Sequence, residues 1–325
     1  MKNALLSGFI FPRVILAPLS GISSLPFRKL NRKFGCKFAY LEMVGARSIN
    51  YLSRRTKQMI AVDPGDRPLG VQLLGKDPDY LSQALEKFKH FPCDLIDFNA
   101  ACPQKKVTRQ GQGAALLKEP VKLAKLLSVM VKESLLPVTV KLRLGWDSPK
   151  GIVDLAKRVE DSGVYAVCLH GRTKMQGYSG SVDYQSIKKV KAALTIPVIA
   201  SGDIWSGELA KKMFDLTSCD AITVARGSLG NPWIFKEINE FLAKGKVIPR
   251  PGIEEVIRVM NEHLNLSIDF YGEKAGVTKF RKFFIWYTRG FLQAKPLRIK
   301  VAVIVKHSQM LELIDEFSAR ASRKI

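Results

Sequence analysis

The sequence predicts an α/β protein in which a (β/α)8 TIM barrel is followed by a small all-α domain. Strand-length apolar runs recur eight times along the chain, and amphipathic stretches lie between them. Most of these runs are continuous rather than alternating, which is typical of parallel strands buried on both faces. Eight βα units over about 235 residues favour a barrel over a doubly wound sheet, which usually uses fewer strands.

The elements follow in order along the chain. The expected strands are residues 14–17, 38–43, 69–73, 95–99, 138–143, 166–170, 198–201 and 221–225. The clearest helices between them are residues 80–89, 121–132, 151–162, 185–193 and 206–215. Pro78 and Pro120 suit the first turns of two of these helices, where a missing N–H costs nothing.

The pattern changes after a segment rich in proline and glycine. We expect a catalytic barrel domain over residues 1–243, a linker over 244–252 and a helical domain over 253–325. The helical domain should contain three helices, at residues 254–270, 275–291 and 298–317.

The composition is that of a soluble globular chain, with 46% hydrophobic and 25% charged residues. No apolar run approaches the length of a membrane span, and Gly8 and Pro12 interrupt the apolar N-terminus, so neither a transmembrane helix nor a signal peptide is expected. The five cysteines are scattered without a CxxC pair, which argues against disulfides and against a metal site. We therefore expect a cytoplasmic protein, a monomer without an obligate protein partner.

The net charge of +23, from 52 Lys+Arg against 29 Asp+Glu, is the strongest global feature. Such a surface attracts polyanions, so nucleic acid is the favoured partner. The alternative is an organism whose proteins are basic in general.

Chemistry in a barrel lies at the carboxyl ends of the strands. The last two strands end in Ser201-Gly202-Asp203 and Ala225-Arg226-Gly227. Glycines let backbone N–H groups approach phosphate oxygens, and Arg226 adds a cation, so these ends predict a phosphate cradle. The alternative is a pair of tight turns that only need glycine.

Two further polar residues point to the barrel mouth. Lys141 lies within an otherwise apolar strand and needs an anionic or polar partner, such as a flavin ring. The alternative for Lys141 is a buried salt bridge to Glu42 or Asp97. His170 ends its strand, where contact with a cofactor is favoured over a satisfied core histidine.

Cys102 follows the fourth strand, with Lys105 and Lys106 nearby. Those cations favour a thiolate nucleophile, whereas a neutral thiol would serve as a general acid. A buried inert cysteine is the third reading, and the residues alone leave all three open.

Ten sequence blocks, in order and spacing, make the chain similar to a known family. They are LAPLSG at 16–21, PFR at 26–28, DFNAACP at 97–103, KKV at 105–107, GAAL at 113–116, PVTVKLRLGW at 137–146, HGRT at 170–173, IPVIASGDI at 196–204, NPWIF at 231–235 and DFYG at 269–272. Over nearly its whole length the chain resembles the flavin-dependent tRNA-dihydrouridine synthases, most closely the bacterial B-type branch.

The resemblance implies an FMN-dependent oxidoreductase that reduces the C5=C6 bond of specific uridines in tRNA, with NADPH or NADH as the reductant. Hydride would pass from flavin N5 to C6, and Cys102 would give the proton to C5. The target base would have to leave its stack to meet both groups. The residues implied to bind FMN are Pro18, Leu19, Ser20, Gln72, Lys141, His170, Ser201, Gly202, Asp203, Ala225 and Arg226.

The resemblance also implies a tRNA-binding helical domain. On a helix through residues 280–291, an aromatic stripe would face the core, and basic residues would lie on the opposite side. The residues expected to contact tRNA are Asn99, Arg143, Arg172, Lys279, Arg281, Lys282, Trp286 and Arg289. An ordinary solvated helix face is the alternative for this segment.

The chain departs from the family pattern at four positions. Ala101 stands where glycine is common, Ser201 where asparagine is common, Ala225 where glycine is common, and Phe283 where histidine is frequent. The rival functions are an FMN barrel acting on a free pyrimidine, such as a dihydroorotate dehydrogenase, and a tRNA-binding protein without catalysis. The first does not explain the charge or the helical domain, and the second does not explain Cys102, Lys141 and His170.

Overall fold

The computed structural model describes residues 9–322 and confirms the predicted TIM barrel. Residues 1–8 and 323–325, which belong to the ends of the two predicted domains, lie outside the described residues. The strands are β1 (Val14–Leu16), β2 (Ala39–Tyr40), β3 (Val44–Gly45), β4 (Leu69–Leu74), β5 (Leu95–Asn99), β6 (Val138–Arg143), β7 (Ala166–His170), β8 (Val198–Ser201) and β9 (Ala221–Val224). Strands β5 to β8 have the predicted bounds.

The sheet closes on itself through parallel pairings. β1 pairs with both β9 and β2, and β2 pairs with β4, which completes the ring. The single strand predicted at residues 38–43 is divided into β2 and β3. Both pair with β4, and together they occupy one strand position of the barrel. Between them the carboxylate of Glu42 accepts a hydrogen bond from the backbone N–H of Gly21.

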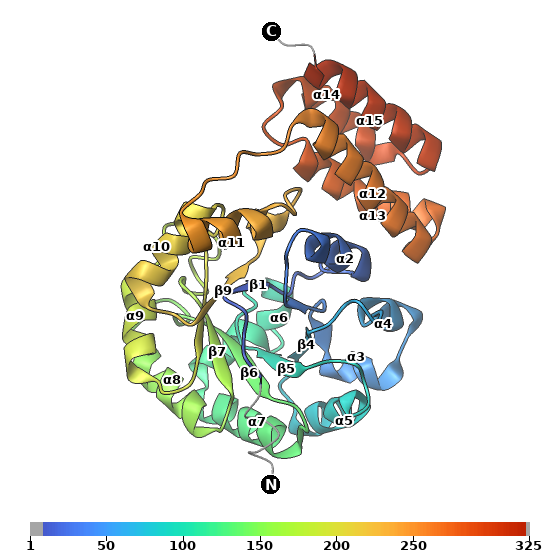
Figure 1. The fold of residues 1–325 in the computed structure, drawn as a ribbon. Coiled ribbons are helices and arrows are strands. Elements are labelled where there is room, and N and C mark those ends of the chain that lie inside the picture. Colours follow the sequence, from blue (N-terminus) through green and yellow to red (C-terminus); the bar gives the residue numbers. More distant parts are fainter. Residues whose placement is uncertain (1–8, 323–325) are drawn as a thin grey trace.

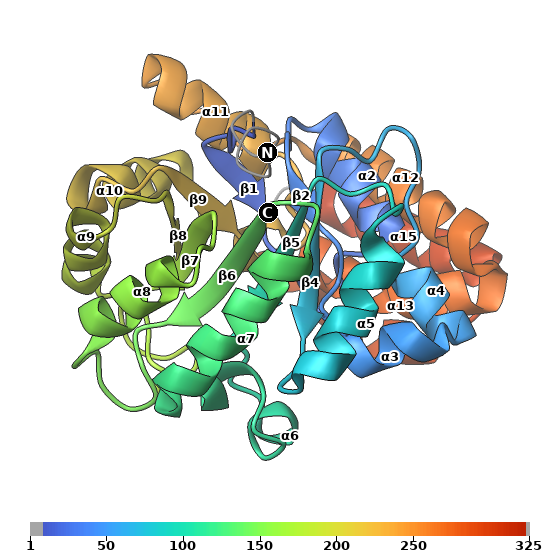
Figure 2. The same cartoon turned by 90° about the horizontal axis from the view of Figure 1, so that it is seen from below.

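Helices surround the barrel, as Figures 1 and 2 show from two directions. They are α2 (Leu25–Lys33), α3 (Ala46–Tyr51), α4 (Arg54–Met59), α5 (Pro78–Phe88), α6 (Lys105–Thr108), α7 (Pro120–Glu133), α8 (Ile152–Asp161), α9 (Tyr184–Ala193), α10 (Gly207–Thr217) and α11 (Ile234–Lys244). Short 3-10 turns lie at Gly113–Lys118 and Arg226–Ser228. Pro78 and Pro120 begin α5 and α7, as predicted.

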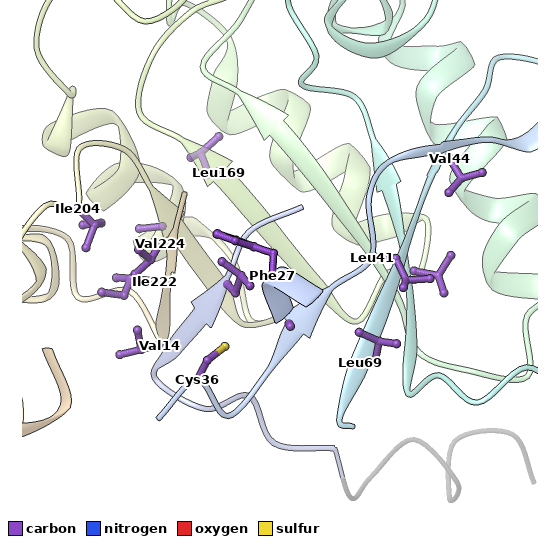
Figure 3. Packing of buried hydrophobic residues seen from close by; sticks show 14 of the residues in the cluster. Val14, Phe27, Cys36, Leu41, Val44, Leu69, Leu169, Ile204, Ile222 and Val224 are labelled. Carbon is purple, nitrogen blue, oxygen red and sulfur yellow. The ribbon is translucent and has the colours of Figure 1, made fainter. Parts of the chain in front are cut away.

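The core lies between the sheet and these helices. Figure 3 shows buried side chains from several staves of the barrel, including Val14, Leu69, Leu169 and Ile222. A second, smaller cluster fills the interior near the amino ends of the strands, where Phe9 makes an edge contact with Phe38 at 5.6 Å. The interior at the amino ends of the strands is therefore filled, which leaves the carboxyl ends of the strands for a functional site.

The C-terminal region is helical, with α12 (Ile253–Tyr271), α13 (Glu273–Tyr287), α14 (Lys295–Lys300) and α15 (His307–Ser322). The first two predicted helices of this region are present, although α13 ends before Phe291. The third, predicted as one helix over residues 298–317, is wrong: it is divided into α14 and α15. The guanidinium of Arg281 donates hydrogen bonds to the carbonyls of Ala302 and Ile304, at 2.6 Å each, and so holds the break between them.

The helical region packs against the barrel beside α2 (Figure 1). Phe283 stacks on Phe27 of α2 with ring centroids 5.5 Å apart, and Lys33 forms an ion pair with Glu262 at 2.8 Å. Residues 245–252 between α11 and α12 form neither helix nor strand. The two-domain division stays a prediction. No helix within residues 9–322 is long and apolar enough to cross a membrane.

Candidate functional site

A cavity of about 390 Å³ opens at the carboxyl ends of the strands. Every residue predicted to bind the cofactor lines it, namely Pro18, Leu19, Ser20, Gln72, Lys141, His170, Ser201, Gly202, Asp203, Ala225 and Arg226. Cys102, Asn99 and Arg143 line the same cavity. The structure therefore brings together residues from β1 through β9 that are far apart in the sequence.

Lys141 and His170 both line this cavity with polar groups. The Lys141 ammonium lies 3.4 Å from Cys168 Sγ and 3.5 Å from Ser201 Oγ, and no carboxylate within residues 9–322 forms an ion pair with it. Burial lowers the pKa of His170 to about 2, so its ring is neutral. Its Nδ1 lies 3.3 Å from Ser201 Oγ, whereas its buried Nε2 has no partner in the described part of the chain. Buried polar atoms are normally paired, so this arrangement suits a polar ligand.

The two turns after β8 and β9 have the tight backbone expected of a phosphate cradle. A Cβ on Gly227 would lie 2.1 Å from the Ile204 carbonyl oxygen, so only glycine fits there. Gly202 has φ +138°, and a Cβ on it would lie 2.7 Å from Val182. Arg226 begins a 3-10 turn, whose first N–H groups have no acceptor within the turn. The two glycine turns and Arg226 thus line the same cavity.

Asp203 joins two arginines at this cradle. It accepts hydrogen bonds from Arg172 and, at 2.9 Å, from Arg226. The Arg226 guanidinium also lies over the rings of Tyr178 and Trp205, 4.9 and 5.2 Å from their centroids. Both aromatic residues line the cavity and were missed from the sequence, because they lie in loops without a periodic pattern.

Cys102 is half-buried at the cavity wall, and its backbone N–H donates to Asn99 Oδ1 at 2.8 Å. Burial raises the pKa of its thiol, so the group is protonated at neutral pH. Lys105 and Lys106 are exposed on α6 and do not contribute to this shift. Of the three readings of Cys102, this environment favours the proton-bearing thiol over the thiolate nucleophile. The other four cysteines are buried, as expected of packing residues.

The basic residues predicted to contact tRNA fall into two groups. Lys279 and Arg289 are exposed on and just after α13, and Trp286 is partly exposed. The others are engaged within the protein. Arg172 is 1% exposed and paired with Asp203, and Arg143 is 3% exposed and donates to the carbonyls of Ala101, Thr173 and Gly177.

Lys282 donates to the Gly21 carbonyl, across the contact between α13 and the loop after β1. Asn99 is 6% exposed and Arg281 holds the break after α14, so neither presents free donors to a large ligand. The surroundings of Arg172, Arg281 and Lys282 support structural roles and give no support to direct contact with RNA. Phe283, where the family often has histidine, is buried against Phe27.

Within residues 9–322 no group of three or more His, Cys, Asp or Glu side chains could hold a metal ion.

Comparison with known proteins shows the family of the chain. The family model described as dihydrouridine synthase matches residues 15–322. The chain belongs to the dihydrouridine synthase family. A probable tRNA-dihydrouridine synthase of Rickettsia bellii is 38% identical over 94% of both chains. The tRNA-dihydrouridine synthase B of Pseudomonas aeruginosa is 38% identical over 88% of this chain and 86% of its own.

A solved structure outside this family supports the barrel assignment. The histamine dehydrogenase of a Rhizobium species superposes with a TM-score of 0.53 at 12% identity, covering 82% of this dihydrouridine synthase family member. The chain spans about half of that enzyme, 51% of its length, so the likeness concerns the barrel fold alone.

Proposed function

We propose that the protein is a tRNA-dihydrouridine synthase, an FMN-dependent oxidoreductase that reduces uridines of tRNA with NAD(P)H. Family membership supports the reaction class. The observation that carries the proposal is the shared cavity, which holds a protonated Cys102 thiol, a neutral His170 with an unpaired Nε2, and Lys141 without a carboxylate partner.

These residues fit FMN from its phosphate to its ring. The turns at Gly202 and Gly227 with Arg226 would hold the phosphate. Pro18 to Ser20 and Gln72 would line the isoalloxazine, and Lys141 would meet the N1–C2=O side, where negative charge gathers on reduction. When bound and reduced, the flavin supplies the hydride that adds to C6 of uracil.

Cys102 then provides the second half of the addition. Hydride at C6 leaves negative charge delocalised over C5 and the C4 carbonyl, and the thiol proton passes to C5. Protonation of C5 completes dihydrouracil, and the resulting thiolate then recovers a proton from solvent. The raised pKa of Cys102 keeps that proton in place until the charge develops.

We propose that tRNA approaches over the exposed basic residues of the helical region. Lys279 and Arg289 would contact phosphates, and Trp286 would offer a ring beside them. The buried arginines Arg143 and Arg172 would instead hold the loops around the cavity in place.

The test is dihydrouridine formation in unmodified tRNA with FMN-loaded protein and NADPH, with free uridine and orotate in parallel. The proposal predicts product in tRNA alone. Turnover of a free pyrimidine would instead support the dihydroorotate dehydrogenase type of reaction, and tight tRNA binding without turnover would support a binding protein.

A further inference from the structure

We propose that Asp97 is a positioning residue, which sets the loop carrying Cys102 through the side-chain amides of Gln72 and Asn99. Asp97 itself neither lines the cavity nor contacts Cys102. Its importance for uracil reduction rests on the proposed function, whereas its hold on the loop does not.

A continuous chain of hydrogen bonds joins the carboxylate to the loop. Gln72 Nε2 donates to Asp97 Oδ2 at 2.7 Å, and Asn99 Nδ2 donates to Gln72 Oε1 at 2.8 Å. Asn99 Oδ1 accepts from the backbone N–H groups of Ala101 at 3.0 Å and Cys102 at 2.8 Å. The three side chains come from β4 and β5, so the chain runs inside the barrel wall.

The direction of every link is dictated by its two ends. Backbone N–H groups only donate, so the oxygen of the Asn99 amide must face Cys102 and its nitrogen must face Gln72. The oxygen of Gln72 must then face Asn99, which turns the Gln72 nitrogen toward residue 97. Only an acceptor at residue 97 satisfies that nitrogen, and a carboxylate is an acceptor on both oxygens.

Burial limits the access of water to these hydrogen bonds. Asp97 is 2% exposed, Gln72 1% and Asn99 6%, and the second Asp97 oxygen accepts from Thr139 Oγ1 at 2.6 Å. An acceptor facing an acceptor in this interior would cost the desolvation of both groups. The amides therefore have one stable orientation, and the loop of Cys102 inherits it.

The sharpest test reverses the donor and acceptor roles in the two hydrogen bonds that join residues 97, 72 and 99. In Asn99→Asp, residue 99 can still accept from Cys102, but its second oxygen faces the Gln72 oxygen. Turning the Gln72 amide only moves the conflict to Asp97. Adding Asp97→Asn removes the conflict, because the new amide nitrogen donates to the turned Gln72 and its oxygen still accepts from Thr139. The double variant has the same net charge as the parent protein. Gln72 is the side chain that links residues 97 and 99.

Two readouts report the position of the thiol. The first is the rate at which iodoacetamide alkylates Cys102, followed by peptide mass spectrometry at pH 8, above the pKa of about 6 that burial gives Asp97. The second is the single-turnover rate of uracil reduction in tRNA by the flavin-loaded, pre-reduced protein. Flavin reduction by NADPH, which does not use Cys102, is the internal control.

We expect Asn99→Asp to alkylate several-fold faster and to reduce uracil about 10- to 100-fold more slowly, because a misplaced group loses that much rate. Adding Asp97→Asn to this variant should restore most of the parent alkylation rate and most of the parent rate of uracil reduction. Thr139→Val is the matched control: it removes the other buried partner of Asp97, leaves the Gln72 link intact, and should leave Cys102 alkylation unchanged.

A double exchange no better than Asn99→Asp alone would overturn the proposal. So would a rescue that persists when Gln72→Leu is added, because the compensation would then be between charges and not through the amide. If no variant or parent reduces uracil but the alkylation pattern holds, the positioning chain stands and the proposed function fails.

Discussion

Lys141→Met should affect the thermal stability of the apoprotein and its affinity for FMN in different ways. Among residues 9–322 the half-buried Lys141 ammonium has Cys168 Sγ at 3.4 Å and Ser201 Oγ at 3.5 Å as its hydrogen-bond partners. Methionine fills similar space without burying a charge, so the apoprotein should keep or raise its melting temperature. FMN binding should weaken, because a hydrogen bond to a charged group contributes about 1.5–3 kcal/mol. That loss corresponds to about a 10- to 100-fold higher Kd.

The assay is a titration of apoprotein with FMN, followed by quenching of flavin fluorescence, beside thermal unfolding of the same apoprotein. Lys150→Met is the control, since Lys150 is exposed on the loop after β6 and the change in net charge is identical. Unchanged FMN affinity in Lys141→Met would refute the reasoning. A large fall in apoprotein stability would refute it equally, because it would show that Lys141 already has a sufficient partner within the protein.

Three further predictions follow from the structure. Cys102→Ala should retain flavin and NADPH oxidation but slow uracil reduction by about 100- to 10,000-fold, the usual contribution of a general acid; full activity would remove its role. Burial lowers the pKa of His263 to about 3, so the unfolded chain binds a proton below pH 6.5 that the folded chain refuses, and stability falls as pH drops. Between pH 6 and 4.5 the parent should lose about 2 kcal/mol more than His263→Gln in urea unfolding, and equal losses would contradict a neutral buried ring. Lys279→Glu with Arg289→Glu should weaken tRNA binding, with flavin content unchanged. The slope of log binding constant against log salt concentration should fall in magnitude by about one for each lost phosphate contact. Unaltered affinity would place the tRNA surface elsewhere.

The strands could be predicted closely from the sequence because their signal is local. β5 to β8 are short segments whose residues are mostly apolar, and their bounds need no knowledge of the partner strands. Helix α2 was not foreseen because Leu25–Lys33 reads as a polar, basic segment. Its Arg28 is fully buried, paired at 2.6 Å with Asp66, which lies far along the chain. The break between α14 and α15 likewise depends on a distant side chain, Arg281.

The same distinction applies to the site. Polar residues at strand ends could be placed at the barrel mouth from topology alone, and all the predicted cofactor residues line one cavity. The roles of cations depend on partners that sequence does not reveal. Arg172 and Lys282 were expected to contact tRNA, and the structure adds that Asp203 pairs with Arg172 and that the Gly21 carbonyl accepts from the partly exposed Lys282. Their contact with tRNA stays a prediction. The link from Asp97 to Cys102 depends on the orientations of two side-chain amides, which the sequence does not reveal.

The most direct test of the proposed function is dihydrouridine content in unmodified tRNA after incubation with purified, FMN-loaded protein and NADPH. The proposed function predicts dihydrouridine at defined positions in tRNA, with none formed from free uridine and no interconversion of orotate and dihydroorotate. Absence of dihydrouridine in tRNA, with an intact flavin that NADPH reduces, would contradict it.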